Sequence, residues 1–195
     1  MTGRPAPDFA ALIAGLAEKL EEHGFPFMLI GGQAVLLHGR PRLTEDIDVT
    51  LGADVSRLSG LLTVCAELGF RVLPEHPRRF AEETSVLPAL DPPSGIRVDF
   101  IFSTTAYERQ AIERAVHVDL AGRSVPFASA EDLILHKLFA GRPRDHEDAT
   151  GVVRRRGKDL NWEYLERWGR EFAQVPGRED LPARIARLKG EETSP

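Results

Sequence analysis

The stretch Phe27–Leu51, FMLIGGQAVLLHGRPRLTEDIDVTL, constrains the fold more than any other part of the chain. Its apolar start, Phe27–Ile30, ends at Gly31-Gly32, which predicts a buried strand turning sharply into a helix over residues 33–38. Two glycines let a ligand approach the backbone closely, and the free N–H groups at a helix N-terminus favour an anion such as phosphate. The sequence therefore predicts a phosphate-sized turn at this point.

Two aspartates follow this turn on a second predicted strand. Residues 46–51 alternate with a period of two, so Asp46 and Asp48 project from the same face. Neighbouring carboxylates are normally tolerated only beside a cation or a basic residue, and oxygen ligands of this kind suit Mg²⁺ or Mn²⁺. A plain tight turn would explain the two glycines alone, and a solvated strand edge would explain the two aspartates alone. The glycine turn and the aspartates together indicate nucleotide chemistry.

A third acid lies in the strongly β-forming run Arg97–Phe102, RVDFIF. Asp99 is the only carboxylate of this run, and an acid between apolar residues is costly to bury without a partner. Asp99 is therefore either an edge-strand charge paired with Arg97 or a functional acid, and the functional interpretation is favoured.

Two motifs of the chain resemble a known family. Gly31-Gly32 followed by Arg42-x-Thr44-x-Asp46-Ile47-Asp48 resembles the signature of the nucleotidyltransferase superfamily typified by DNA polymerase beta. Within it, the chain looks most similar to the AbiEii/MenT-like toxins and their bacterial relatives. The later run HKLFAGRPRDHEDA, residues 136–149, is similar to the family's downstream motif, in which a helical lysine precedes a basic loop and Asp-x-x-Asp.

The resemblance implies a role for each matching residue. It implies that the metal ligands are Asp46, Asp48 and Asp99, which would hold Mg²⁺ or Mn²⁺. It implies that the catalytic residues are these three acids and Lys137. The nucleotide-binding residues that it implies are Gly31, Gly32, Arg42, Thr44, Lys137, Arg144 and Asp145.

The downstream motif leaves alternatives open. Lys137 is a compact cation suited to the charge that develops on leaving pyrophosphate. Asp145 would either orient Lys137, contact the nucleotide, or stabilise a helix N-terminus. For Asp148, helix stabilisation is the favoured interpretation. The basic run Arg154–Lys158 is interpreted first as an exposed helix end and second as an RNA contact.

The implied reaction is transfer of a nucleoside monophosphate from a nucleoside triphosphate to an acceptor hydroxyl, with release of pyrophosphate. The toxin branch suggests a tRNA acceptor and an antitoxin partner, whereas other members modify proteins or small molecules such as aminoglycosides. Many members carry Gly-Ser at the phosphate turn, where this chain has Gly31-Gly32 and then Gln33. This departure motivates an alternative, a catalytically weakened nucleotide-binding or antitoxin-binding module.

Composition limits the other possibilities. A formal net charge of −5 argues against broad, nonspecific binding of nucleic acid, although it allows a local basic groove. The sequence shows neither a transmembrane stretch nor the hydrophobic core of a signal peptide, so we expect a cytoplasmic protein without membrane partners. The single Cys65 lies in an apolar run and is expected to be a small core residue.

The predicted fold class is α+β, a nucleotidyltransferase-like mixed sheet flanked by helices and followed by a helical C-terminal part. We expect a core over residues 1–128 and a helical subdomain over residues 129–195. Helices are expected at residues 8–22, 33–38, 55–68, 105–115, from 129, from 144, 161–173 and 180–188. Strands are expected at residues 27–30, 46–51, 70–73, 85–90, 97–102, 116–120 and 123–126.

Overall fold

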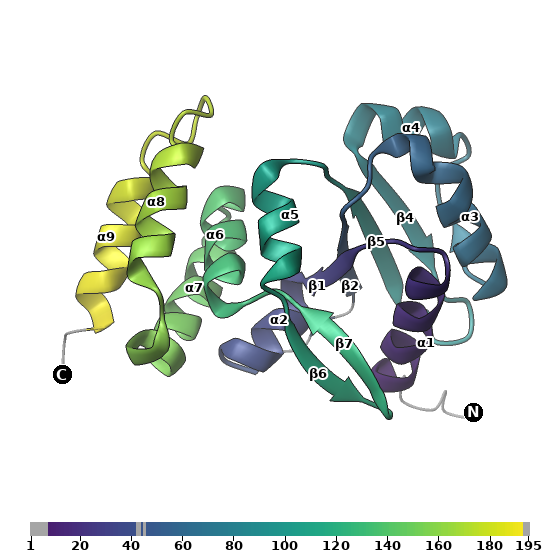
Figure 1. Cartoon of the computed structure of the whole chain (residues 1–195), viewed down its shortest axis with the longest axis horizontal. Helices are drawn as coiled ribbons and strands as arrows, with labels where there is room; N and C mark the ends of the chain where they lie inside the picture. Colours follow the sequence, from purple (N-terminus) through teal and green to yellow (C-terminus); the bar gives the residue numbers. More distant parts are fainter. Residues whose placement is uncertain (1–7, 42–43, 45, 193–195) are drawn as a thin grey trace. The chain divides into compact units, whose positions relative to one another are not determined.

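A seven-stranded mixed sheet organises the first of two units into which the chain divides (Figure 1). The structure is a computed structural model and describes residues 8–41, 44 and 46–192. The first unit holds the described residues up to Ile30 and those from Thr44 to Phe127. The second holds the described residues from Gly31 to Pro41 and those from Ala128 onward. The sequence predicted a single division, between residues 128 and 129. It did not predict that the segment starting at Gly31 belongs to the C-terminal unit.

The sheet confirms the mixed α+β architecture. Its strands are β1 (Phe27–Ile30), β2 (Asp46–Leu51), β3 (Arg71–Val72), β4 (Val86–Leu90), β5 (Arg97–Phe102), β6 (Val116–Leu120) and β7 (Arg123–Phe127). They lie in the order β3-β4-β5-β2-β1-β7-β6. β2 pairs with β5 in parallel and β1 with β7 in parallel, while the other neighbours are antiparallel. β2, which carries Asp46 and Asp48, is therefore the central strand of the sheet.

Alternating side chains build the core around these central strands. Ile47 and Val49 of β2 are fully buried, and so are Val98 and Phe100 of β5. The residues between them, including Asp48, are only partly buried. This alternation is the period-two pattern of a sheet with one face in the core, and it was predicted for both strands.

Helices α1 (Phe9–Glu22), α3 (Leu58–Glu67), α4 (Pro77–Thr84) and α5 (Ala106–Glu113) complete the first unit. The expected helix over residues 55–68 begins instead with a 3₁₀ turn, Val55–Arg57, and the expected strand over 70–73 shortens to two residues. α4 was not predicted. It begins with Pro77 at its first position and ends at Ser85, whose φ is +57°.

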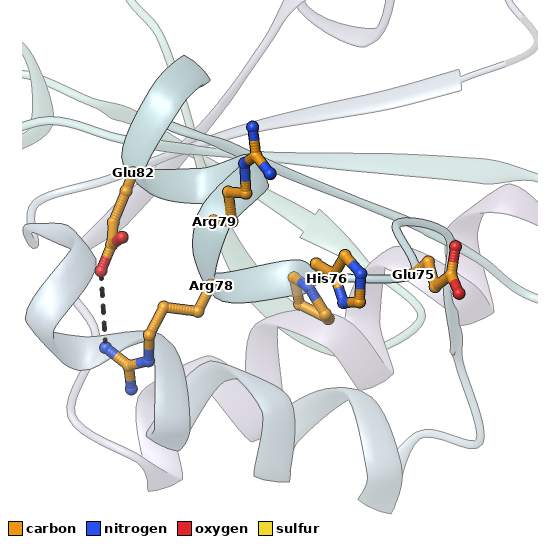
Figure 2. Close-up of a pocket in the computed structure, with 6 residues that line it drawn as sticks. Glu75, His76, Arg78, Arg79 and Glu82 are labelled. Carbon is orange, nitrogen blue, oxygen red and sulfur yellow. Dashed lines mark ion pairs between the residues drawn. The ribbon is translucent and has the colours of Figure 1, made fainter.

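A shallow pocket of about 350 Å³ lies at the start of α4 (Figure 2). It is lined by Glu75, His76, Pro77, Arg78, Arg79 and Glu82. Its arginines form ion pairs along their own helix: Arg78 lies 3.9 Å from Glu82, and Arg79 lies 2.8 Å from Glu83. No residue of the predicted nucleotide or metal site lines this pocket, and we assign it no function.

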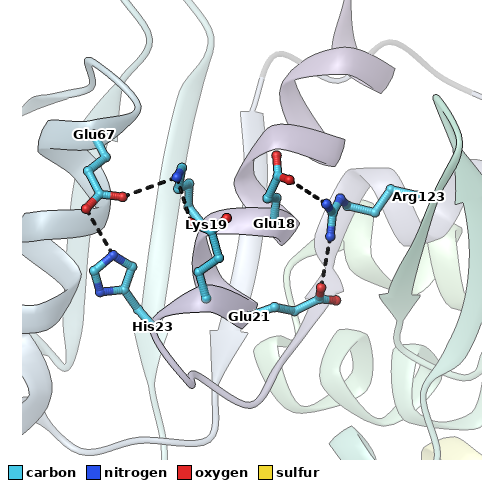
Figure 3. Close-up of polar contacts among 7 residues, drawn as sticks. Glu18, Lys19, Glu21, His23, Glu67 and Arg123 are labelled. Atoms are coloured by element: carbon cyan, nitrogen blue, oxygen red, sulfur yellow. Dashed lines mark hydrogen bonds and ion pairs between the residues drawn. The ribbon is translucent and has the colours of Figure 1, made fainter.

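Exposed ion pairs join α1 to its neighbours in the first unit (Figure 3). Arg123 of β7 reaches Glu18 at 2.6 Å and Glu21 at 3.0 Å. Glu67 of α3 lies 3.5 Å from Lys19 and 3.2 Å from His23. Exposed pairs of this kind contribute little to stability because water screens them, so the buried apolar face of α1 dominates its packing.

Helices alone make up the described part of the second unit. They are α2 (Gly31–His38), α6 (Ala130–Ala140), α7 (Pro143–Arg156), α8 (Trp162–Phe172) and α9 (Leu181–Glu192), with a 3₁₀ turn at Gly157–Asp159. Ser129 caps α6, because its side-chain oxygen accepts a hydrogen bond from the backbone N–H of Asp132. Asp132 is itself fully buried and accepts hydrogen bonds from Ser129 at 2.6 Å and from Tyr164 at 2.7 Å.

Cys65 is a core residue, as expected. It is 1% exposed, and burial raises the pKa of its thiol to about 12, so the thiol stays protonated at neutral pH. Within the described residues, no helix combines the length and the apolar character needed to cross a membrane.

His38 anchors α2 within the second unit. Its Nε2 lies 2.8 Å from the carbonyl oxygen of Ala128, which can only accept, so Nε2 carries the proton and donates. Burial is the largest effect on the pKa of His38 and lowers it, and the hydrogen bond to Ala128 offsets part of this. Among the nearby charges, Arg156 and Arg155 lower the pKa and Glu131 raises it. His38 is therefore neutral when folded.

Stability is expected to fall as the pH drops below about 6.5, the usual histidine pKa. In that range the unfolded chain binds a proton at His38 that the folded protein does not, so acid favours unfolding. The variant His38→Gln should show a smaller fall in melting temperature between about pH 7.5 and 5.5. His117→Gln, at an exposed position on β6, is the control and should keep the wild-type slope. Equal slopes in wild type and His38→Gln would contradict this assignment.

Candidate active-site residues

Three aspartates occupy one face of two adjacent parallel strands. In the register of β2 and β5, Asp48 lies opposite Asp99 and Asp46 lies opposite Arg97. All four residues alternate with buried neighbours, so they share the outward face of the sheet. Neighbouring strands of a sheet lie about 4.8 Å apart, so opposed residues on them are close together. We call Asp46, Asp48, Asp99 and Arg97 the carboxylate face.

Two of these carboxylates have short contacts within the first unit. Asp99 Oδ1 lies 2.8 Å from Nε of Arg97, so the pairing that the sequence left open is present. Asp46 Oδ1 accepts a hydrogen bond from the hydroxyl of Thr44 at 3.0 Å. Thr44, predicted to bind nucleotide, therefore orients Asp46 in this structure. Arg42, predicted with it, lies outside the described residues.

The predicted metal ligands are the three aspartates of the carboxylate face. Within residues 8–41, 44 and 46–192, no group of three or more histidine, cysteine, aspartate or glutamate side chains is arranged to hold a metal ion. The register and the donor chemistry nevertheless fit a hard divalent cation, because three carboxylates share one face and two of them are directly opposed. A cation bound there would compete with Arg97 for the carboxylate of Asp99. The metal ligands therefore remain a prediction.

The predicted phosphate turn follows β1 directly. β1 ends at Ile30, whose partner on β2 is Asp48, and α2 then begins at Gly31. α2 thus starts two residues earlier than expected. Gly31 has a φ of +61°, in the left-handed region that favours glycine. Gly32 is buried. The local shape agrees with a sharp strand-to-helix turn, while phosphate binding by either glycine is untested.

Lys137 lies in a buried ion cluster of the second unit. Its side chain is 11% exposed, and Nζ lies 3.0 Å from Asp145 Oδ1 and 2.9 Å from Asp148 Oδ2. α6 ends at Gly141, whose φ of +72° reverses the chain so that the first turn of α7 faces Lys137. The ammonium group is thereby fixed between two carboxylates.

Asp145 combines two of the roles that the sequence left open. One carboxylate oxygen contacts Lys137, and the other accepts from the backbone N–H of Arg142 at 3.2 Å and from its Nε at 3.0 Å. Asp145 therefore stabilises the start of α7 and orients Lys137. For Asp148, the favoured interpretation as a helix-stabilising residue was wrong. Asp148 is buried against Lys137. The i, i+3 spacing of the two acids was the available signal.

The arginines of α7 differ in their contacts. Arg144, predicted to contact phosphate, is exposed on α7. In the basic run, Arg155 donates to the carbonyl oxygen of Gly39 at 3.0 Å, which ties the end of α7 to the end of α2. All three arginines of the run occupy the last turn of α7, where positive charge offsets the helix dipole. This agrees with the favoured interpretation as a helix end.

Comparisons with solved structures define the class of fold. The antibiotic-resistance factor ANT(2'')-Ia is 20% identical over 93% of this chain and 95% of that chain, with a TM-score of 0.54. An antigenic nucleotidyltransferase-like protein from Paracoccidioides brasiliensis is 15% identical over 91% of each chain, with a TM-score of 0.55. The lincosamide antibiotic adenylyltransferase LnuA is 16% identical over 75% of this chain and 96% of that chain, with a TM-score of 0.51. The fold is that of the nucleotidyltransferases.

The family follows from the sequence itself. The family described as nucleotidyl transferase AbiEii toxin, type IV toxin–antitoxin system, matches residues 14–160, which is most of the chain. The chain belongs to this AbiEii nucleotidyltransferase family. A search of curated proteins found no match. The matched region includes every residue to which the sequence assigns a catalytic, metal-binding or nucleotide-binding role.

Proposed function

We propose that this chain transfers a nucleoside monophosphate from a nucleoside triphosphate to an acceptor hydroxyl. The observation that carries the proposal is the register of β2 and β5, which opposes Asp48 and Asp99 and sets Asp46 on the same face. The membership of the chain in a nucleotidyltransferase family supports it. The acceptor oxygen attacks the α-phosphorus, the bond from the α-phosphorus to the bridging oxygen breaks, and pyrophosphate leaves.

The three aspartates are the proposed holders of Mg²⁺ or Mn²⁺. A divalent cation bound there would supply Lewis-acid stabilisation of the charge on the phosphate oxygens. Asp99 is also the proposed acceptor of the proton that leaves the attacking hydroxyl. Thr44 holds the carboxylate of Asp46 through its hydroxyl, which limits the rotation of that side chain.

Lys137 has the proposed role of the cation that neutralises the triphosphate. An ammonium group has three N–H donors, and Asp145 and Asp148 contact it in the structure. Two fixed carboxylates keep the ammonium in place, so that little reorganisation is needed when a phosphate oxygen arrives. Gly31 and Gly32 are the proposed backbone donors at the phosphate, and Arg144 is a further proposed phosphate contact.

The proposed acceptor is the 3′ end of a tRNA, in keeping with a toxin family, and an antitoxin protein is the proposed partner. Arg144 and Arg154 are exposed cations that suit an RNA backbone, against a net charge of −5 for the whole chain. Protein and small-molecule acceptors are alternatives. The names of two proteins of similar fold, an antibiotic-resistance factor and a lincosamide adenylyltransferase, motivate the small-molecule alternative.

The test is to incubate the protein with Mg²⁺ and each labelled nucleoside triphosphate, with and without total bacterial RNA. The double variant Asp46→Asn/Asp48→Asn is the control. We expect label on RNA with the unaltered protein only. The triphosphate that gives this label identifies the nucleotide that the protein transfers. Label on the protein itself or on an added aminoglycoside would assign a different acceptor. Binding of nucleotide without any release of pyrophosphate would overturn the proposal in favour of a binding module.

A further inference from the structure

Arg97 brings a positive charge to the carboxylate face. It lies directly opposite Asp46 in the β2–β5 register, and its Nε contacts Asp99 Oδ1 at 2.8 Å. Spacing of two residues along β5 keeps Arg97 and Asp99 on the same face as Asp46 and Asp48. The guanidinium therefore contacts one of the three carboxylates that a divalent cation would need.

The exposures of the two partners differ. The side chain of Arg97 is 52% exposed, whereas that of Asp99 is 18% exposed. Arg97 can therefore leave the pair into water at little cost, while Asp99 stays in place. Three neighbouring carboxylates repel one another, and a positive charge beside them relieves this repulsion. Arg97 meets that need when no metal ion is bound.

We propose that Arg97 is a built-in counter-ion, which a divalent cation must displace from Asp99 when it binds the carboxylate face. This inference rests on the proposed metal-dependent function. Arg97 pairs with Asp99 when no metal ion is bound, and it competes with the metal for that carboxylate. The two effects have opposite signs: loss of Arg97 destabilises the metal-free protein and tightens metal binding.

The experiment measures Mn²⁺ binding, with free Mn²⁺ followed by electron paramagnetic resonance. We expect Arg97→Gln to bind Mn²⁺ about fivefold more tightly than wild type, the upper range for loss of a partly exposed ion pair. In chelator, its melting temperature should be lower than that of wild type. Arg97→Lys keeps the charge and should bind Mn²⁺ within about twofold of wild type.

Arg79→Gln is the matched control for net charge. Arg79 is exposed and pairs through Nε with Glu83 at the same 2.8 Å, but on α4. The Arg79→Gln variant should bind Mn²⁺ with an affinity within about twofold of wild type. An equal gain in Arg79→Gln and Arg97→Gln would overturn the inference, because a general charge effect would explain both.

The remaining outcomes separate the inference from the proposed function. If wild type binds Mn²⁺ and Arg97→Gln binds it no more tightly, Arg97 does not compete and only the inference fails. If neither protein binds Mn²⁺, the metal site of the proposed function fails together with the inference. A merely structural Arg97 would lower the melting temperature of Arg97→Gln without tightening Mn²⁺ binding.

Discussion

Replacing Asp48 with asparagine is expected to reduce nucleotide transfer by at least about 100-fold, the usual scale for losing one group that stabilises transition-state charge. Asp48 lies between Ile30 of β1 and Asp99 of β5, at the centre of the sheet. Asparagine has nearly the same shape but no charge, so it cannot serve as an anionic ligand of a hard divalent ion. The measurement is the rate of pyrophosphate release from the reactive triphosphate.

The control for this variant is Asp119→Asn, which removes the same charge from an exposed position on β6. Asp119 accepts from the backbone N–H of Gly122 through Oδ1, and an asparagine oxygen can do the same. Asp119→Asn should keep full activity, and both variants should keep the wild-type circular dichroism. Unchanged transfer by Asp48→Asn would remove Asp48 from the proposed metal ligands.

The sequence predicted the carboxylate face well because strand periodicity alone determines it. Asp46-x-Asp48 and Arg97-x-Asp99 each place two side chains on one face whatever the neighbouring strands are. The alignment of Asp48 with Asp99 requires the register between β2 and β5, which depends on how the intervening residues pack. The contact between Arg97 and Asp99 was one of two interpretations, and it depends on side-chain positions that the sequence pattern does not determine.

Two other features were hard to predict for different reasons. α4 is a short helix of eight mostly polar residues, and its signals were Pro77 at the first position and the i, i+4 pairs Arg78–Glu82 and Arg79–Glu83. Ser85, the C-cap residue that follows α4, adopts a left-handed conformation that usually indicates glycine. The assignment of α2 to the second unit reflects its packing on α6 and α7, which chain order does not reveal.

Replacing Lys137 with methionine is expected to lower the free energy of unfolding by about 3–5 kcal/mol and to abolish most transfer activity. Methionine preserves much of the volume but leaves Asp145 and Asp148 as buried carboxylates without their ammonium partner. Arg142 still contacts Asp145 in this variant. Urea unfolding measures the stability, and pyrophosphate release measures the activity.

A triple variant separates stability from chemistry. Lys137→Met/Asp145→Asn/Asp148→Asn removes the ammonium together with both of its carboxylate partners, and asparagine at residue 145 keeps an oxygen that can accept from the backbone N–H of Arg142. It should regain most of the lost stability, because the penalty comes from unpaired buried charge rather than from lost packing. It should stay inactive, because the proposed phosphate cation is still missing.

The control is Lys158→Met, which removes a lysine from an exposed position in the same unit and should change neither quantity. Two results would contradict the assignment in different ways. Full stability of Lys137→Met would mean that the buried ion pairs do not form as they appear here. Recovery of both stability and transfer in the triple variant would mean that Lys137 serves the fold, and that another group neutralises the triphosphate.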